Sequence, residues 1–161
     1  GLAAVPLSDV WSSRRRDHGV TLCHMSDHFT LRLPSGTTAR IRRRADRSGS
    51  APRTLAQRYV EEGLRHDDHP LVHFLAGASG RRATLIGTGL EVWEVIATVR
   101  DNHDDPGAAA DYLEISPGLV EAALLYYGEY GEEIDREIVQ NEEEWERGYA
   151  AWQAAQRALR P

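Results

Sequence analysis

Residues 28–36 read HFTLRLPSG, a run in which apolar and polar side chains alternate until Pro34 ends it. Successive side chains of a strand point to opposite faces, so a strand here would bury one set and display the other. The set expected to be buried is Phe29, Leu31 and Leu33. The displayed set is His28, Thr30 and Arg32. Because a lone strand is not stable by itself, we expect this one to pair with a strand from elsewhere.

Two helical patterns follow the predicted strand. The first starts near Ser35 and stops at Gly49. The second has Ser50 as its expected cap and Pro52 in its first turn, and its apolar face consists of Leu55, Ala56, Tyr59, Val60 and Leu64. A strand and two helices in about 40 residues cannot bury a core alone. Antiparallel pairing of two strands across a two-fold axis would supply the missing surface, so we expect a homodimer or a higher homo-oligomer.

The stretch FTLRLPSGTTARIRRRADRSGSAPRTLAQRYVEEGL, residues 29–64, resembles the ribbon-helix-helix family of DNA-binding proteins, which includes the Arc, MetJ and CopG repressors. In that family a ribbon of paired strands enters the major groove. The resemblance implies a base-reading set of His28, Thr30 and Arg32. It also implies phosphate contacts near the start of the second helix, and the expected phosphate-binding set is Arg40, Arg43, Arg44, Ser50 and Arg53.

The sequence departs from the family pattern in the first helix. Arg44 stands where the family usually has a large aliphatic residue, and Gly36 with Thr37 weakens the helix start. An ordinary edge strand over two core helices, with a solvated arginine face, therefore remains an alternative interpretation of the same residues.

Charge is divided unevenly along the chain. The net charge is -6, but residues 1–65 hold 12 arginines and 6 acidic residues, whereas residues 66–161 hold 7 arginines and 19 acidic residues. The first part suits a polyanion such as double-stranded DNA, and the second would repel one.

The single Cys23 excludes an internal disulfide and a multi-cysteine zinc site. No apolar run approaches the length of a membrane helix, so we expect a cytoplasmic protein with no membrane contact.

Four segments are expected. Residues 1–25 are predicted to be a disordered or extension arm, and Met25 is a possible translation start. Residues 26–65 form the ribbon-helix-helix domain, residues 66–128 a hairpin plus a helix-turn-helix-like domain, and residues 129–161 an amphipathic C-terminal helix. The predicted fold class is therefore mainly α with a small β component.

The third segment contains a hairpin pattern and three helical patterns. Apolar runs around Leu71–Leu75 and Ala83–Ile86 flank a turn. Asp105 and Ser116 each precede a proline, which is typical of a helix start, and the last two helices match a helix-turn-helix. The exposed residues at the start of the third helix are expected to be Ser116, Gly118 and Glu121. We favour packing or dimerisation over DNA reading there, because few arginines are present to hold phosphates.

The run LIGTGLEVWEVI through DYLEISPGLVEAALLYYGEYGEEIDREI resembles the family called domain of unknown function 433. The matching residues are Ile86, Gly87, Thr88, Leu90, Val92 and Trp93, whereas Gly89 and Glu91 depart from the family pattern. Proteins with that domain are often antitoxins of the VapB type, encoded beside a PIN-like ribonuclease toxin. The resemblance therefore implies such a toxin as a partner.

The last segment carries an apolar stripe with residues seven apart on a long helix. The expected partner-binding residues are Ile138, Trp145, Tyr149, Trp152 and Leu159. The stripe could fold back on the preceding domain, pair with its twin or lie in a toxin groove. The nearby acids Glu142, Glu143, Glu144 and Glu146 form either a solvated face or a match for a basic nuclease surface.

We predict a non-enzyme without a cofactor, since the sequence has no phosphate-binding glycine loop, nucleophile elbow or cysteine–histidine pair beyond Cys23. The main hypothesis is a dimeric DNA-binding antitoxin that represses its own operon. A stand-alone transcriptional regulator is the alternative. A metal-dependent enzyme or sensor using His66, His69 and His73 is a third hypothesis, although a turn and a strand would separate the imidazoles.

Overall fold

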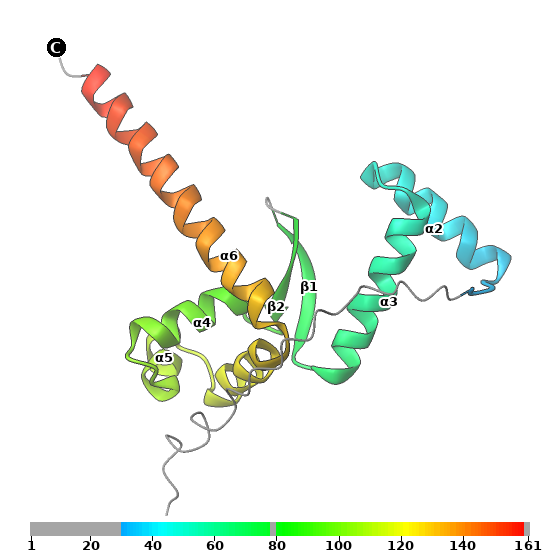
Figure 1. Ribbon diagram of the computed structural model, residues 1–161, viewed down its shortest axis with the longest axis horizontal. Coiled ribbons are helices and arrows are strands. Elements are labelled where there is room, and N and C mark those ends of the chain that lie inside the picture. The colour runs from blue at the N-terminus through cyan, green and yellow to red at the C-terminus, as the bar shows by residue number, and fades with distance from the viewer. Residues whose placement is uncertain (1–29, 78–79, 160–161) are drawn as a thin grey trace, which may run out of the picture. The chain divides into compact units, whose positions relative to one another are not determined.

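The computed structural model describes residues 30–77 and 80–159 (Figure 1). The predicted arm at residues 1–25, with Cys23 and Met25, lies outside the described residues, as do His28 and Phe29. The chain divides into two units, Gly1–Thr38 and Ala39–Pro161. Helices with one small antiparallel sheet make up the described structure, which confirms the predicted mainly helical class. The ribbon-helix-helix and helix-turn-helix assignments stay predictions.

The described part of the first unit has no strand. Residues 30–34 lack regular secondary structure, and α2 (Ser35–Ser48) begins directly after them. The Thr38 amide donates to the Pro34 carbonyl at 3.0 Å, which sets the first helical turn. The strand predicted at HFTLRLPSG is therefore not confirmed. Its ladder hydrogen bonds would have to come from a partner strand, and the described residues offer none to this segment.

Helices α2 and α3 (Pro52–Asp68) are joined by a tight turn. Gly49 has φ +63, a value that favours glycine, and the Ser50 amide donates to the Ala45 carbonyl at 3.0 Å to close the end of α2. The predicted Ser50 cap is wrong, because Ala51 occupies the capping position without a side-chain bond. The Ser50 hydroxyl instead donates to the Ser48 carbonyl at 3.4 Å, so it is engaged within the turn.

The predicted hairpin is confirmed. Strands β1 (Val72–Gly77) and β2 (Gly80–Leu85) pair antiparallel, with Val72 opposite Leu85 and Gly77 opposite Gly80. Helix α3 contacts β1. The Arg81 guanidinium on β2 donates to both carboxylate oxygens of Glu62 on α3, at 2.6 and 2.8 Å, and ties that helix to the hairpin.

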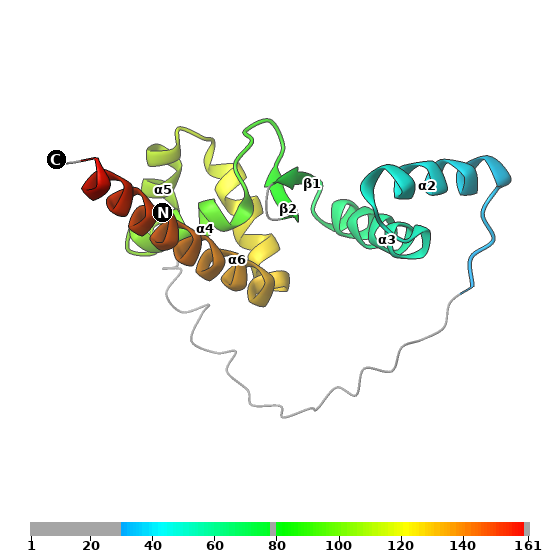
Figure 2. The ribbon, with the colours of Figure 1, turned by 90° about the horizontal axis from the view of Figure 1, so that it is seen from above.

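Three helices complete the fold: α4 (Val92–Asp101), α5 (Pro106–Leu113) and α6 (Pro117–Ala158) (Figures 1 and 2). Helix α4 starts with a capping box between Glu91 and Glu94. Helix α5 starts as predicted, since the Asp105 carboxylate accepts from the Gly107 amide at 2.8 Å. These helices and the hairpin enclose one core, which includes Leu85, Val92, Val95, Val120, Tyr126 and Ile134.

Helix α6 has a buried half and an exposed half. Its buried side chains end at Ile138, and almost every residue from Glu142 onward is exposed. The domain boundary predicted after residue 128 falls inside this helix, close to Tyr130, whose φ of -115 and ψ of 29 break the regular helical geometry. The predicted apolar stripe is thus divided between the core and the surface. No helix among the described residues has an apolar stretch long enough to cross a membrane.

Candidate functional site

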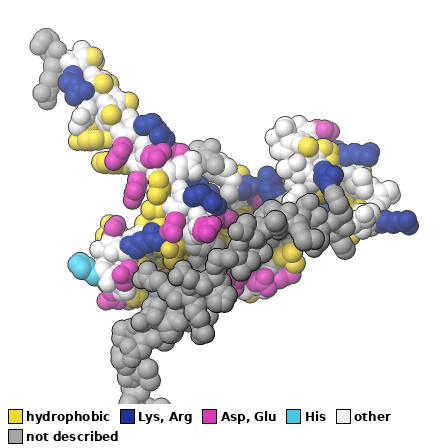
Figure 3. All heavy atoms as spheres, in the orientation of Figure 1, with side chains coloured by type: hydrophobic (Ala, Val, Ile, Leu, Met, Phe, Trp, Pro, Cys, Tyr) yellow, Lys and Arg dark blue, Asp and Glu magenta, His cyan; other side chains and the backbone are white. Residues whose placement is uncertain are grey.

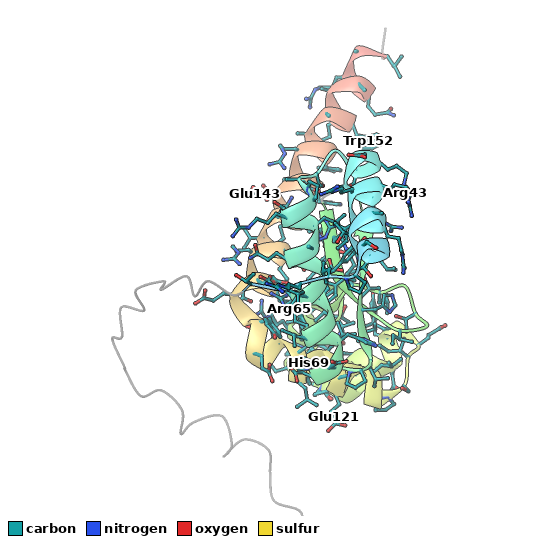
Figure 4. All side chains as sticks on the ribbon, turned by 90° about the vertical axis from the view of Figure 1, so that its right-hand side faces the viewer. Arg43, Arg65, His69, Glu121, Glu143 and Trp152 are labelled. Carbon is teal, nitrogen blue, oxygen red and sulfur yellow. The ribbon has the colours of Figure 1, made fainter. Side chains whose placement is uncertain are left out.

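Four arginines form a basic stripe along α2. Arg40, Arg43, Arg44 and Arg47 are spaced i, i+3, i+4 and i+7, which places them on one face of a helix. All of them are exposed, and Arg43 projects from α2 in Figure 4. Ile41 and Ala45 occupy the other side, and Ala45 is fully buried. We call these four residues the arginine stripe.

The arginine stripe is unneutralised within residues 30–77 and 80–159. None of its members has an ion pair or a ring contact there, although arginines elsewhere in the chain have both. Figure 3 shows dark blue arginine side chains at the surface in this part of the molecule. Exposed guanidinium groups with no internal partner are free to contact phosphates, which they can hold in bidentate fashion.

The predicted DNA-binding residues are only partly brought together. Arg40, Arg43 and Arg44 share the stripe, and Arg53 is exposed in the first turn of α3. Thr30 and Arg32 are exposed in the irregular segment before α2, while His28 lies outside the described residues. The structure therefore groups part of the phosphate-binding set on one helix face and leaves the base-reading set without a strand to present it.

A second exposed surface lies on the last turns of α6. The rings of Trp145 and Tyr149 stack with centroids 5.1 Å apart, and Tyr149 and Trp152 stack at 5.8 Å. These side chains are 65%, 46% and 56% exposed, respectively. We call Trp145, Tyr149 and Trp152 the aromatic face. Figures 3 and 4 show apolar side chains on α6 and the position of Trp152.

The other predicted partner-binding residues lie elsewhere. Ile138 is only 8% exposed and belongs to the core, so its assignment to a partner surface is corrected. Leu159 is exposed at the last described position. Ile138 and Trp145 lie on the same side of α6, as their seven-residue spacing predicts. The core ends between them, because the surrounding helices cover only the first half of α6.

A polar cluster fixes α3 against α6. The Arg65 guanidinium donates to the Glu133 carboxylate and to the Tyr126 hydroxyl, each at 2.9 Å, and lies 4.2 Å from the Tyr130 ring centroid. Burial lowers the pKa of Arg65, but Tyr126 and Glu133 together outweigh it and raise the pKa above its ordinary value. Burial also raises the pKa of the Tyr126 phenol. The hydrogen bonds and the ion pair join α3 to α6, so the cluster is a structural anchor.

Glu137 on α6 has a carboxyl group whose pKa is raised well above its ordinary value. One of its carboxylate oxygens is buried without a hydrogen-bond partner among the described residues. The pKa of Glu137 is raised to about 7, mainly by burial. Arg82 opposes this rise, whereas the nearby charges of Glu133 and Glu91 add to it. An acid whose pKa is raised on folding stabilises the fold at low pH, and that stability is lost as the pH rises through its folded-state pKa.

Glu137→Gln is therefore expected to raise the free energy of unfolding by about 1 kcal/mol at pH 8, a value reduced because the side chain is partly exposed. At pH 4 we expect no difference, since the wild-type carboxyl is then protonated in the folded state. Urea unfolding followed from pH 4 to pH 8 measures both values. Glu132→Gln, at an exposed position of α6, is the control, and equal pH profiles for the two variants would contradict the assignment.

The histidines proposed as metal ligands are not grouped. His66 Nδ1 lies 2.8 Å from the Val72 carbonyl oxygen. His69 packs edge-on against Tyr126 and lies 3.4 Å from Glu129. Among the residues that the structure describes, no three His, Cys, Asp or Glu side chains converge in a way that could hold a metal ion.

Two features of the site were missed in the sequence. Arg47 completes the arginine stripe, and its i+7 spacing from Arg40 was a usable signal. The Arg65 and Glu133 pair joins residues 68 positions apart, so no local pattern could have indicated it.

Comparisons with family models, with curated proteins and with solved structures found no match to this chain. The two family resemblances accordingly stay predictions, and the exposed arginine stripe and aromatic face are the observations from which a function can be inferred.

Proposed function

We propose that this protein binds double-stranded DNA through its N-terminal segment and acts as the antitoxin and autorepressor of a toxin–antitoxin operon. The arginine stripe is the observation that carries the proposal. Its length along α2 is about 10 Å, over which a DNA duplex presents several phosphates. Four guanidinium groups on one exposed face, with no ion pair among the described residues, would bind such a backbone through counterion release.

Base reading is assigned to a ribbon formed by two copies of residues 28–33. Thr30 and Arg32 are exposed and available to such a ribbon. The exposed apolar side chains of α3 support a second copy, because Tyr59, Val60 and Leu64 lack cover within the described chain. In the dimer these residues would be buried and the arginine stripe would remain outside.

The proposal that the C-terminal segment binds a toxin rests on the aromatic face. Stacked aromatic side chains in an acidic segment suit a partner groove with a basic rim, such as the substrate channel of a PIN-like ribonuclease toxin. A stand-alone transcriptional regulator is the alternative, in which no toxin is encoded nearby and the aromatic face serves assembly alone.

DNA binding is tested by fluorescence anisotropy with a labelled duplex from the region upstream of the gene. We expect wild type to prefer this duplex over a scrambled one, and Arg32→Ala to lose about 1 to 3 kcal/mol of that preference. A salt titration separates backbone contacts from base contacts. Equal binding of wild type to both duplexes would contradict a base-reading ribbon.

Removing residues 142–161 is expected to abolish partner binding, to leave the fold intact and not to weaken DNA binding, because the buried side chains of α6 end at Ile138. Co-purification with the product of the neighbouring gene measures partner binding, and circular dichroism checks the fold. Removal of residues 129–161 would be a poor test, since it deletes the core residues Ile134 and Ile138. A shortened chain that still binds the neighbouring protein would exclude the aromatic face.

A further inference from the structure

Four of the described arginines share one arrangement, in which a guanidinium lies near an aromatic ring and a carboxylate. The four sets are Arg58 with Tyr59 and Glu62, Arg65 with Tyr130 and Glu133, Arg82 with Trp93 and Glu91, and Arg100 with Tyr127 and Asp135. The guanidinium carbon lies 5.8, 4.2, 6.0 and 5.3 Å from the ring centroids, respectively. A cation gains from the ring and from the carboxylate together.

The exposed half of α6 presents the same two partners without an arginine. Glu142 and Glu146 flank the aromatic face at helical spacing, on one side of it. Both carboxylates are exposed, and neither has an ion pair within the described ranges. Arg147 pairs with Glu143 at 3.6 Å on the opposite side of the helix. The aromatic face with Glu142 and Glu146 therefore offers both kinds of arginine partner, and no arginine among the described residues occupies it.

The arginine stripe of α2 is the complementary surface. Its members have neither a ring nor a carboxylate partner in the part of the chain that the structure describes. The stripe spans the same number of residues as the aromatic face, since Arg40 to Arg47 and Trp145 to Trp152 are both seven positions apart. Two helices with these spacings can be laid side by side with the charges opposed.

We propose that the aromatic face of α6, with Glu142 and Glu146, binds the arginine stripe of α2 in a second copy of this chain. Where both contacts form between the same two chains, a two-fold axis relates them and the result is a closed dimer. The small side chains Gly148, Ala151 and Ala155 line the other edge of the aromatic face and let a second helix approach closely. The contact uses the two surfaces that the proposed function assigns to DNA and to the toxin. Its consequence rests on that function: α6 would compete with DNA for the arginine stripe, and α2 would compete with the toxin for the aromatic face.

Charge exchange between full-length variants tests the contact. The acidic-side variant carries Glu142→Arg and Glu146→Arg, and the basic-side variant carries Arg40→Glu, Arg43→Glu, Arg44→Glu and Arg47→Glu, so that the charge of each surface is reversed. Both are made in a Cys23→Ser background, with one dye at Asp46→Cys and the other at Ala154→Cys on separate chains, so energy transfer reports an α2–α6 contact between copies. Asp46 and Ala154 lie off the two surfaces.

We expect wild-type chains to show energy transfer that weakens with salt. Each variant mixed with itself should associate about tenfold more weakly, because like charges then face each other. A mixture of the two variants should regain wild-type association, since both contacts of the mixed dimer are again oppositely charged. Equal energy transfer in all combinations, or none in any, overturns the proposal.

The DNA readout separates this contact from the proposed function. Glu142→Gln with Glu146→Gln should raise DNA affinity about tenfold at low salt, because the competing surface is weakened. If the charge exchange behaves as expected and no chain binds DNA, the contact stands and the DNA function fails. If DNA binds and the charge exchange shows no pairing, the contact fails and the DNA function stands.

Discussion

Replacing Arg43 and Arg47 with alanine should weaken DNA binding about 30-fold at physiological salt and lower the slope of log affinity against log salt by about two. Each lost phosphate contact removes nearly one released counterion, and the effect is the same for every DNA sequence. Both residues are exposed and lack internal partners among the described residues, so their removal should not affect folding. Anisotropy titrations at several salt concentrations give the affinity and the slope.

Two controls make this prediction specific to the arginine stripe. Arg42→Ala removes a positive charge from the opposite face of α2 and should have a much smaller effect. Arg43→Lys with Arg47→Lys keeps the charge and should retain the salt slope. A loss after Arg42→Ala as large as that of a single stripe substitution would show that net charge, and no particular face, governs binding.

Replacing Tyr126 with alanine should lower the free energy of unfolding by about 3 to 5 kcal/mol. The side chain is fully buried, and it contacts His69 and Tyr130 while its hydroxyl accepts a hydrogen bond from Arg65. Because whole domains are stable by about 5 to 15 kcal/mol, such a loss would leave a marginal protein. Urea unfolding followed by tryptophan fluorescence measures the change.

Tyr126→Phe separates the ring from the hydroxyl. It keeps the packing and removes one partner of Arg65, so we expect a loss of about 1 kcal/mol. Arg65 would retain its ion pair with Glu133 at 2.9 Å. If Tyr126→Phe lowers the free energy of unfolding as much as Tyr126→Ala does, the hydroxyl's hydrogen bond accounts for the contribution of Tyr126 and the packing of its ring does not.

Sequence patterns predicted those elements that depend on interactions between residues close together in the chain. The hairpin followed from two apolar runs around a turn, and the start of α5 followed from Asp105 before a proline. The capping role of Ser50 was wrong because its hydroxyl bonds within the preceding turn. The predicted strand at residues 28–33 would need a partner strand for its ladder hydrogen bonds, and the described residues offer none to residues 30–33.

Sequence patterns likewise predicted only part of the candidate site. The arginine stripe follows from spacing alone, and three of its members were predicted. Periodicity also found the aromatic face, but it could not show where burial ends along α6, which depends on how far α4 and the hairpin reach. The anchor of Arg65, Tyr126 and Glu133 requires the tertiary structure, since its members come from distant positions in the chain.

The end of burial at Ile138 divides α6 into two halves of unequal resistance to opening. We expect the hydrogen-bonded amides of the buried half to exchange only when the core opens, whereas those after Ile138 need only the fraying of an exposed helix. The aromatic face can therefore unwind and re-form many times within one lifetime of the folded core. A partner that holds the aromatic face helical has to offset only the conformational entropy lost in this exposed half of α6. The affinity of a partner for the aromatic face can therefore change without altering the stability of the folded core.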